Sequence, residues 1–151
     1  MIGHSLGGAL SLIMASAAPE KFKGVSLIAP FFDYNDPEKI RNLIPYAKLA
    51  NIIAPTYSFK IPIPEKYKHN SHFFEDKLFK GEKICAHNVI ISDSCLKRMN
   101  EEYIPKFSSP LLTIECGMDK QVSNKAIRSF YEKCKSIDKT IINYDEVDHN
   151  I

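Results

Sequence analysis

The sequence predicts an α/β fold, in which a mostly parallel sheet with flanking helices is interrupted by a helical insertion. Short runs of aliphatic and β-branched residues, typical of buried parallel strands, occur at 25–30, 111–117 and 139–147. A helical pattern precedes the first of these runs, and another lies between the last two. Strand, helix and strand at this spacing are typical of a parallel sheet.

The first expected helix is the small, apolar run "LGGALSLIMASAA", residues 6–18. Its composition predicts a helix packed on nearly all sides, with Gly7 and Gly8 allowing a close approach at its N-terminus. Pro19 ends this helix because proline cannot continue it. The run "VSLIAP", introduced by Gly24, then predicts a buried strand.

The segment 33–109 is expected to be an insertion, with residues 1–32 before it and 110–151 after it. Prolines recur in this segment, and helical patches alternate with irregular stretches. One patch, "KIRNLIPYAKLANII", predicts an amphipathic helix that Pro45 would bend. Its apolar residues recur at steps of three or four: Ile40, Leu43, Ile44, Ala47, Ala50 and Ile53.

The region 110–151 returns to a regular alternation of strand and helix. The strands "LLTIECG" and "KTIINYDEV" enclose the run "SNKAIRSFYEKCKS", which predicts an amphipathic helix. One face of that helix is apolar: Ala126, Ile127, Phe130 and Cys134.

Composition places the chain among ordinary globular proteins, since 44% of its 151 residues are hydrophobic. Twenty Lys and Arg against 18 Asp and Glu give a net charge of +2, which argues against a nucleic-acid partner. No run approaches the roughly 18 apolar residues of a membrane-spanning helix, and no basic region typical of a signal peptide precedes the first helix. The four cysteines form no C-x-x-C pair, so we expect free thiols, a reducing compartment and a cytoplasmic protein.

The opening residues match the pattern G-x-S-x-G at Gly3, Ser5 and Gly7. This pattern is typical of a nucleophile elbow, a strained turn from strand to helix that exposes a serine hydroxyl. Such a turn requires small neighbours and an immediately following helix, and the sequence has both. The helix N-terminus directs backbone N–H groups at the site, where they stabilise a developing oxyanion. The alternative is a glycine-rich turn that opens an ordinary helix.

A serine hydroxyl becomes a strong nucleophile when an oriented base accepts its proton. On a sheet of this kind the partners follow in the order Ser, Asp or Glu, His, just beyond strand ends. Asp119 comes two residues after "LLTIECG" and His149 two residues after "KTIINYDEV", so these are the expected acid and base. Glu115, within its strand, is a second candidate for the acid. Three further carboxylates are expected to be solvated or turn residues, the last of them also a candidate local cap: Asp145, Glu146 and Asp148.

Other histidines have simpler interpretations. His4, inside the elbow, is expected to pack and hydrogen-bond beside Ser5 rather than to act as the base. His69 and His72, in "HNSH", resemble metal ligands, but no Cys or carboxylate pair lies at zinc-finger spacing. We therefore expect a surface loop there and no metal site.

The segments "GHSLGGALSLIMA", "VSLIAPFF" and the stretch from "LLTIECG" to "VDHNI" resemble the α/β-hydrolase superfamily. More narrowly, they are similar to its monoacylglycerol lipase and lysophospholipase branch, grouped with the serine aminopeptidase S33-type hydrolases. The resemblance covers nearly the whole chain. It implies Ser5 as nucleophile, Asp119 as orienting acid and His149 as base, with the Leu6 N–H as an oxyanion donor and no cofactor. It also implies that residues 33–109 form a cap.

The resemblance further implies that the chain is the C-terminal part of an α/β-hydrolase domain. A complete member of the family carries further strands ahead of the elbow, and a loop with a second oxyanion donor. We therefore expect the strand "VSLIA" to have an unpaired edge, which favours aggregation.

The implied function is hydrolysis of a lipid carboxylic ester, a monoacylglycerol or a lysophospholipid, through an acyl-enzyme. In the family the cap is apolar, shapes a pocket for the acyl chain and would let the protein touch a membrane transiently. Two alternatives remain: a peptidase or small-ester hydrolase on the same scaffold, and a truncated, inactive fragment of such a hydrolase.

Overall fold

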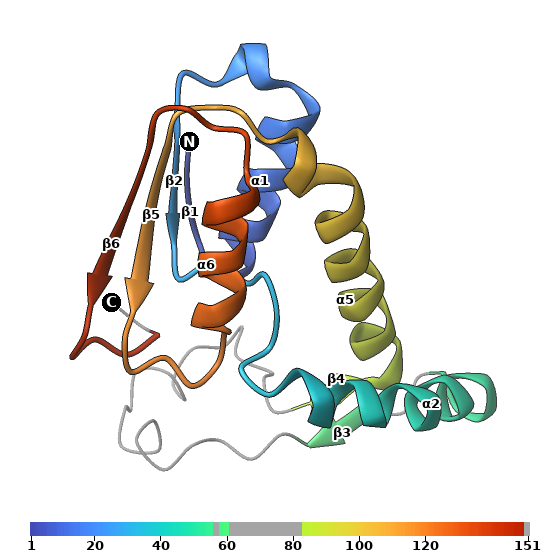
Figure 1. The fold of residues 1–151 in the computed structure, drawn as a ribbon. Helices are drawn as coiled ribbons and strands as arrows, with labels where there is room; N and C mark the ends of the chain where they lie inside the picture. Colours follow the sequence, from blue (N-terminus) through green and yellow to red (C-terminus); the bar gives the residue numbers. More distant parts are fainter. Residues whose placement is uncertain (56–57, 61–82, 150–151) are drawn as a thin grey trace, which may run out of the picture. The chain divides into compact units, whose positions relative to one another are not determined.

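The computed structural model describes residues 1–55, 58–60 and 83–149 (Figure 1). The chain divides into two compact units, which are described separately below. The first unit joins Met1–Ile40 to Ser94–Ile151, and the second is Arg41–Asp93.

A four-stranded parallel sheet forms the centre of the first unit, which confirms the predicted α/β fold (Figure 1). Its strands, in spatial order, are β1 (Ile2–His4), β2 (Val25–Ile28), β5 (Leu111–Cys116) and β6 (Lys139–Tyr144). The three predicted strands are present, each ending one to three residues earlier than expected. The expected free edge on "VSLIA" is wrong, because β2 pairs with β1 on one side and β5 on the other.

Helix α1 (Leu6–Ala17) follows β1 without a loop, as the elbow pattern predicts. The prediction that this helix is packed on nearly all sides is wrong. Leu12 and Ala15 are buried, but Leu6, Leu10 and Met14 are 53–60% exposed. These three side chains lie four residues apart and therefore share one face of the helix. The other face packs on the sheet.

Helix α6 (Asn124–Lys133) connects β5 to β6, and it lies on the same side of the sheet as α1 (Figure 1). This is expected, because two right-handed crossovers that run in the same direction across a sheet place their helices on the same face. The Ser123 hydroxyl caps the helix by accepting a hydrogen bond from the Ala126 N–H. Ile127, Phe130 and Cys134 are buried, which confirms the predicted apolar face.

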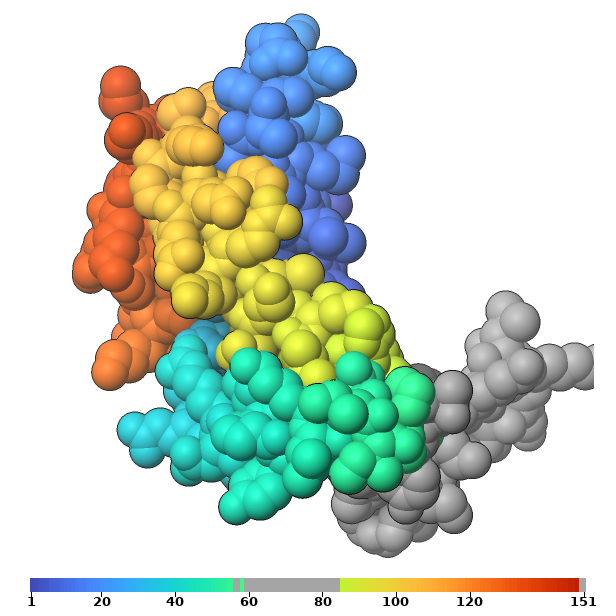
Figure 2. Space-filling model, turned by 90° about the vertical axis from the view of Figure 1, so that its right-hand side faces the viewer, coloured from blue at the N-terminus to red at the C-terminus, as the bar shows by residue number. Residues whose placement is uncertain are grey.

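Residues 99–107 pack between α1 and α6 and close the core of the first unit (Figure 2). They form a π-helical turn, Met99–Tyr103, and a 3-10 turn, Ile104–Lys106. The Phe107 and Phe32 rings contact Phe130 edge-to-face, with ring centroids 5.6 and 4.6 Å from that of Phe130. Such pairs add about 0.5–1.5 kcal/mol beyond their buried area.

The second unit holds most of α2 (Pro37–Ile53) and α5 (Ala86–Arg98), with an antiparallel pair formed by β3 (Ser58–Lys60) and β4 (Lys83–Cys85). The helix predicted from "KIRNLIPYAKLANII" is confirmed, and it continues through Pro45. Within this helix no side chain of the predicted apolar face is buried, and Leu43 and Ile53 are exposed. Within the described ranges, no helix combines the length and apolar character needed to cross a membrane.

Candidate active site

Ser5 sits at the turn between β1 and α1 in a strained backbone conformation, with φ 52°. A non-glycine residue rarely adopts a positive φ unless its surroundings impose it. Here the Ser5 N–H donates to the Ile28 carbonyl, 3.0 Å away. The Ser5 carbonyl accepts from the N–H groups of Gly8, Ala9 and Phe31, at 3.0, 3.3 and 2.9 Å. The turn is therefore held by both its own helix and the chain that leaves β2.

Close packing around this turn explains two of its glycines. A Cβ on Gly3 would lie 2.3 Å from the Gly7 carbonyl oxygen, and one on Gly8 would lie 2.8 Å from the Pro30 Cβ. No real side chain tolerates either contact without a shift. Gly7 differs, since nothing in the described structure lies within 4 Å of its Cβ position. The close approach predicted for Gly7 and Gly8 is made by Gly8.

The structure brings together the three side chains expected to form the site. The His149 Nε2 lies 2.9 Å from the Ser5 Oγ, and the His149 Nδ1 lies 2.7 Å from the Asp119 Oδ2. A carboxylate only accepts, so Nδ1 carries the proton and Nε2 is left as the acceptor for the serine hydroxyl. The side chains of His149 and Asp119 are 4% and 0% exposed, so little water competes for this bond.

Asp119 is oriented by the loop that carries it, residues 117–123, which we call the acid loop. Its Oδ1 accepts hydrogen bonds from the N–H groups of Gln121 and Val122, at 2.8 and 3.0 Å. The two backbone donors occupy one carboxylate oxygen and leave the other for His149. The position and rotamer of the acid are thus determined locally, within three residues of its own backbone.

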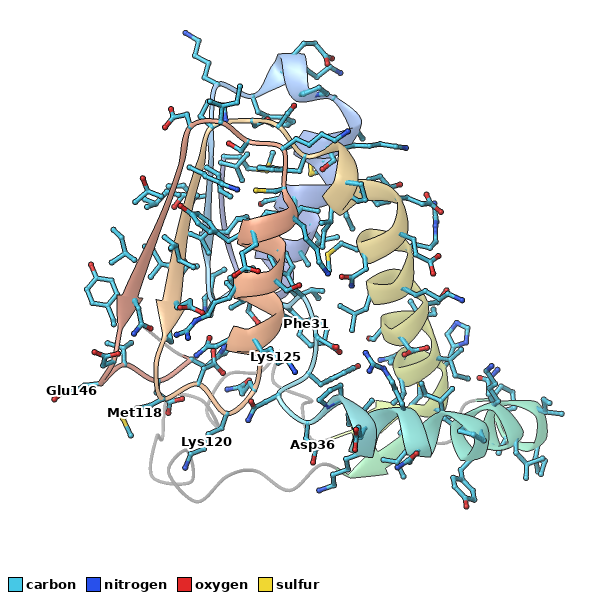
Figure 3. The ribbon with its side chains drawn as sticks, viewed as in Figure 1. Phe31, Asp36, Met118, Lys120, Lys125 and Glu146 are labelled. Carbon is cyan, nitrogen blue, oxygen red and sulfur yellow. The ribbon has the colours of Figure 1, made fainter. Side chains whose placement is uncertain are left out.

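The segment after β6, residues 145–149, carries His149, and we call it the histidine loop. The Met118 N–H donates to the Val147 carbonyl at 3.0 Å, and the Gly117 N–H donates to the Tyr144 carbonyl at 2.8 Å. These bonds join the acid and histidine loops at the edge where the strands end. Figure 3 shows Met118 and Lys120 after β5 and Glu146 after β6, all at this edge.

The structure removes Glu115 from the candidate acids. Its carboxylate, 2% exposed, accepts from the Arg128 Nε at 3.0 and 3.1 Å, and it is not bonded to His149. This hydrogen bond raises the pKa of the Arg128 guanidinium. Asp145 bonds Asn143, in agreement with a turn role.

Asp148 makes the local contact expected of a cap. Its Oδ1 accepts a hydrogen bond of 2.7 Å from the N–H of His149, the next residue. Glu146 is exposed. Neither carboxylate replaces Asp119 at the ring of His149.

His4 makes a hydrogen bond beside Ser5, as expected, and its partner is the main chain of His149. Its Nε2 is 2.8 Å from the main-chain carbonyl oxygen of His149, and the two imidazole rings have centroids 4.9 Å apart. His69 and His72 lie outside the described residues. Among the described residues, no cluster of His, Cys, Asp and Glu side chains could hold a metal ion.

The Leu6 N–H, the expected oxyanion donor, is at the first position of α1 and donates to no acceptor in the described part of the chain. It is the first of the unpaired N–H groups at a helix N-terminus. The thiol of Cys116, at the end of β5, is fully buried, and this burial, with the carboxylates of Asp119, Asp148 and Glu115, raises its pKa. All four cysteines are free in the structure.

One part of the site was not anticipated: the segment 29–36, which leaves β2. The Phe31 N–H bonds the Ser5 carbonyl, and the Asn35 N–H bonds the Gln121 carbonyl at 3.2 Å. The Ser123 N–H donates to the Asp33 carbonyl at 3.0 Å. These bonds use backbone groups, which every residue has, so side-chain types could not indicate them.

Comparisons with known proteins show which family and which folds this chain is similar to. A family model described as serine aminopeptidase, S33, matches residues 1–151. Monoglyceride lipase from Rattus norvegicus is 27% identical over 155 residues, which span 99% of this chain and 50% of the relative. The chain thus covers about half the length of the curated relatives it matches.

Two solved structures of lipases share the fold. Monoacylglycerol lipase from Paleococcus ferrophilus superposes with a TM-score of 0.79 at 22% identity, covering 99% of this chain and 59% of that one. A soluble variant of monoglyceride lipase from Saccharomyces cerevisiae, in complex with a substrate analog, gives 0.77 at 18% identity, covering 100% and 54%.

Proposed function

Because this chain belongs to the serine aminopeptidase S33 family, we propose that it carries the catalytic residues of a serine hydrolase acting on lipid carboxylic esters. The observation that supports this most directly is the hydrogen-bonded series Ser5–His149–Asp119, with distances of 2.9 and 2.7 Å. Each side chain follows a different strand of one parallel sheet, β1, β6 and β5 respectively. Nucleophile, base and orienting acid in this order are the parts that acyl transfer by a serine requires.

In the proposed reaction, the Ser5 Oγ attacks the ester carbonyl carbon while the His149 Nε2 accepts the hydroxyl proton. Asp119 holds the Nδ1–H and stabilises the imidazolium that forms. The Leu6 N–H stabilises the negative charge on the carbonyl oxygen. His149 then returns the proton to the departing alcohol, which leaves an ester between Ser5 and the acyl group. Water, deprotonated by His149, attacks the acyl carbon of this acyl-enzyme. His149 then returns the proton to the Ser5 Oγ as the bond to the acyl group breaks, which releases the carboxylic acid and restores the Ser5 hydroxyl.

The proposed class of substrate is inferred from the curated relatives, which are named monoglyceride lipase. We propose a monoacylglycerol or a lysophospholipid as the substrate, with residues 33–109 as a cap. The exposed apolar side chains of α2 have the character that an acyl chain or a membrane surface requires: Leu43, Tyr46, Leu49, Ile52 and Ile53.

Reaction with a fluorophosphonate probe, read by intact mass, tests the proposed chemistry. The probe modifies a serine whose base and oxyanion donors are assembled. We expect one label on the 151-residue chain, located at Ser5, and its loss in Ser5→Ala and His149→Ala. Labelling that persists in Ser5→Ala would contradict the assignment of the nucleophile. A folded chain that takes no label would favour the inactive-fragment alternative.

A substrate panel separates the lipase from the second candidate, a peptidase, which the name of the matching family favours. Hydrolysis rates are compared for p-nitrophenyl esters of increasing acyl length and for amino-acid amides. The lipase proposal expects the rate to rise with acyl length. A preference for short esters or for amides would overturn it.

A further inference from the structure

The hydrogen bond between the side chain of His4 and the main chain of His149 has no part in the reaction just described. We propose that His4 is a positioning residue: its Nε2–H holds the carbonyl of His149 and thereby holds the base against Ser5. The His4 Nε2 and the His149 carbonyl oxygen are 2.8 Å apart, although the two residues are 145 positions apart in the sequence. This inference rests on the proposed function, because His149 is the base there.

The chemistry of the contact determines its direction. A carbonyl oxygen only accepts, so the Nε2 of His4 must carry the proton in this bond. The imidazole rings of His4 and His149 also touch, with centroids 4.9 Å apart and planes inclined at 42°. The side chain of His4 therefore contacts His149 twice, once at the main-chain carbonyl and once at the imidazole ring.

The bond adds a further attachment to those that the histidine loop makes elsewhere in the described chain. Bonds at Tyr144 and Val147 attach the start of this loop to the acid loop. Farther along, the His149 N–H donates to the side chain of its neighbour Asp148. The contact from His4 attaches the main chain of His149 directly to β1, the strand that immediately precedes Ser5.

Asp119 and His4 have complementary effects on the base. Asp119 fixes the tautomer and the direction of the ring through Nδ1. His4 fixes where the residue sits relative to the strand that leads into the nucleophile. Because displacement of a catalytic group by 1 Å can cost about 10²-fold in rate, a modest anchor is sufficient to matter.

Two substitutions separate the donor from the ring. His4→Phe keeps a flat ring against His149 but lacks the N–H, whereas His4→Gln keeps a side-chain N–H donor. We expect the maximal rate of fluorophosphonate labelling at Ser5 to fall roughly two- to tenfold in His4→Phe, the range that loss of one partly exposed hydrogen bond produces. The probe concentration for half-maximal rate should not change, and His4→Gln should stay within about twofold of the parent chain. His87→Phe, at an exposed histidine of the second unit, is the matched control and should label at the parental rate.

The ring proton of His149 gives a readout that does not depend on turnover. In proton–nitrogen spectra, the Nδ1–H held by Asp119 is expected to exchange faster with water in His4→Phe and at the parental rate in His4→Gln. Parental labelling and parental exchange in His4→Phe would overturn the inference, as would a His4→Gln chain as slow as His4→Phe. If the parent chain takes no label, the proposed function fails, and the exchange comparison still decides whether His4 holds His149.

Discussion

Gly117 is a residue at which even the shortest side chain should disturb the proposed site. It lies where the acid loop leaves β5, and the backbone of the histidine loop passes directly over it. A Cβ added to Gly117 would lie 2.5 Å from the Asp145 carbonyl oxygen and 2.6 Å from the Asp145 Cα. Ordinary contact begins at 3.4 Å, so the two backbones must separate by roughly 1 Å. Backbone atoms cannot rotate aside as a flexible side chain would.

That movement is transmitted to the proposed base, since Asp145 is four residues before His149. The distances of 2.9 Å to Ser5 and 2.7 Å to Asp119 leave no room for a shift of this size without loss of a hydrogen bond. A misplacement of about 1 Å corresponds to a rate lower by about 10²-fold. Gly117→Ala should therefore label at Ser5 about 10²-fold more slowly, with a fall in stability of about 1–3 kcal/mol from overpacking.

Gly24→Ala is the matched control, because its Cβ would meet Pro110 at 3.5 Å, an ordinary contact, at the opposite end of the sheet. The assay is the time course of fluorophosphonate labelling, measured beside urea unfolding of each variant. Gly24→Ala should label like the parent chain. If Gly117→Ala labels within about threefold of the parent and is equally stable, the reasoning from backbone overlap is refuted.

Three further outcomes test other parts of the site. Asp119→Asn should slow labelling by about 10³- to 10⁴-fold, because the amide no longer selects the Nδ1–H tautomer of His149; a loss below tenfold would argue against an orienting acid. Arg128→Ala leaves the buried Glu115 carboxylate unpaired and should cost about 1–3 kcal/mol in urea unfolding, whereas Arg98→Ala, in an exposed pair with Glu102, should unfold like the parent chain. Burial raises the pKa of Cys116 above its ordinary 9.0, so the folded chain keeps this proton longer than the unfolded chain. The contribution of this thiol to the free energy of unfolding is complete below pH 9.0 and is lost as the pH rises through the raised pKa of the folded chain. The free energy of unfolding should therefore fall more steeply with pH in the parent chain than in Cys116→Ala.

The proximity of Ser5, Asp119 and His149 could be predicted from the sequence because parallel strands end at a common edge. Asp119 and His149 each follow a strand directly, so their place in the chain determines their place in space. The same reasoning separates Asp119 from Glu115. A residue inside a strand projects from a face of the sheet, where Glu115 meets Arg128 on α6. A residue beyond the strand end is free to face the neighbouring loop.

The burial of α1 could not be predicted in the same way. Its residues are small and apolar all round, yet Leu6, Leu10 and Met14 are exposed. The composition of a helix indicates which of its side chains tolerate burial. Whether they are buried depends on which other helices and strands pack against that helix. The same distinction applies to α2, whose apolar residues recur at helical spacing although Leu43 and Ile53 are exposed.

The segment that leaves β2 explains how three loops from different strands form one site. Ala29, with φ 39°, turns the chain out of the sheet, and Phe31 immediately donates to the carbonyl of the strained Ser5. Farther along, Asp33 and Asn35 bond the acid loop on both sides of Val122. One short segment thus links the turn at Ser5 to the acid loop, and His4 links that turn to His149. Because β1 has only three residues, such contacts from outside the strand must supply much of the rigidity that keeps Ser5 within 2.9 Å of His149.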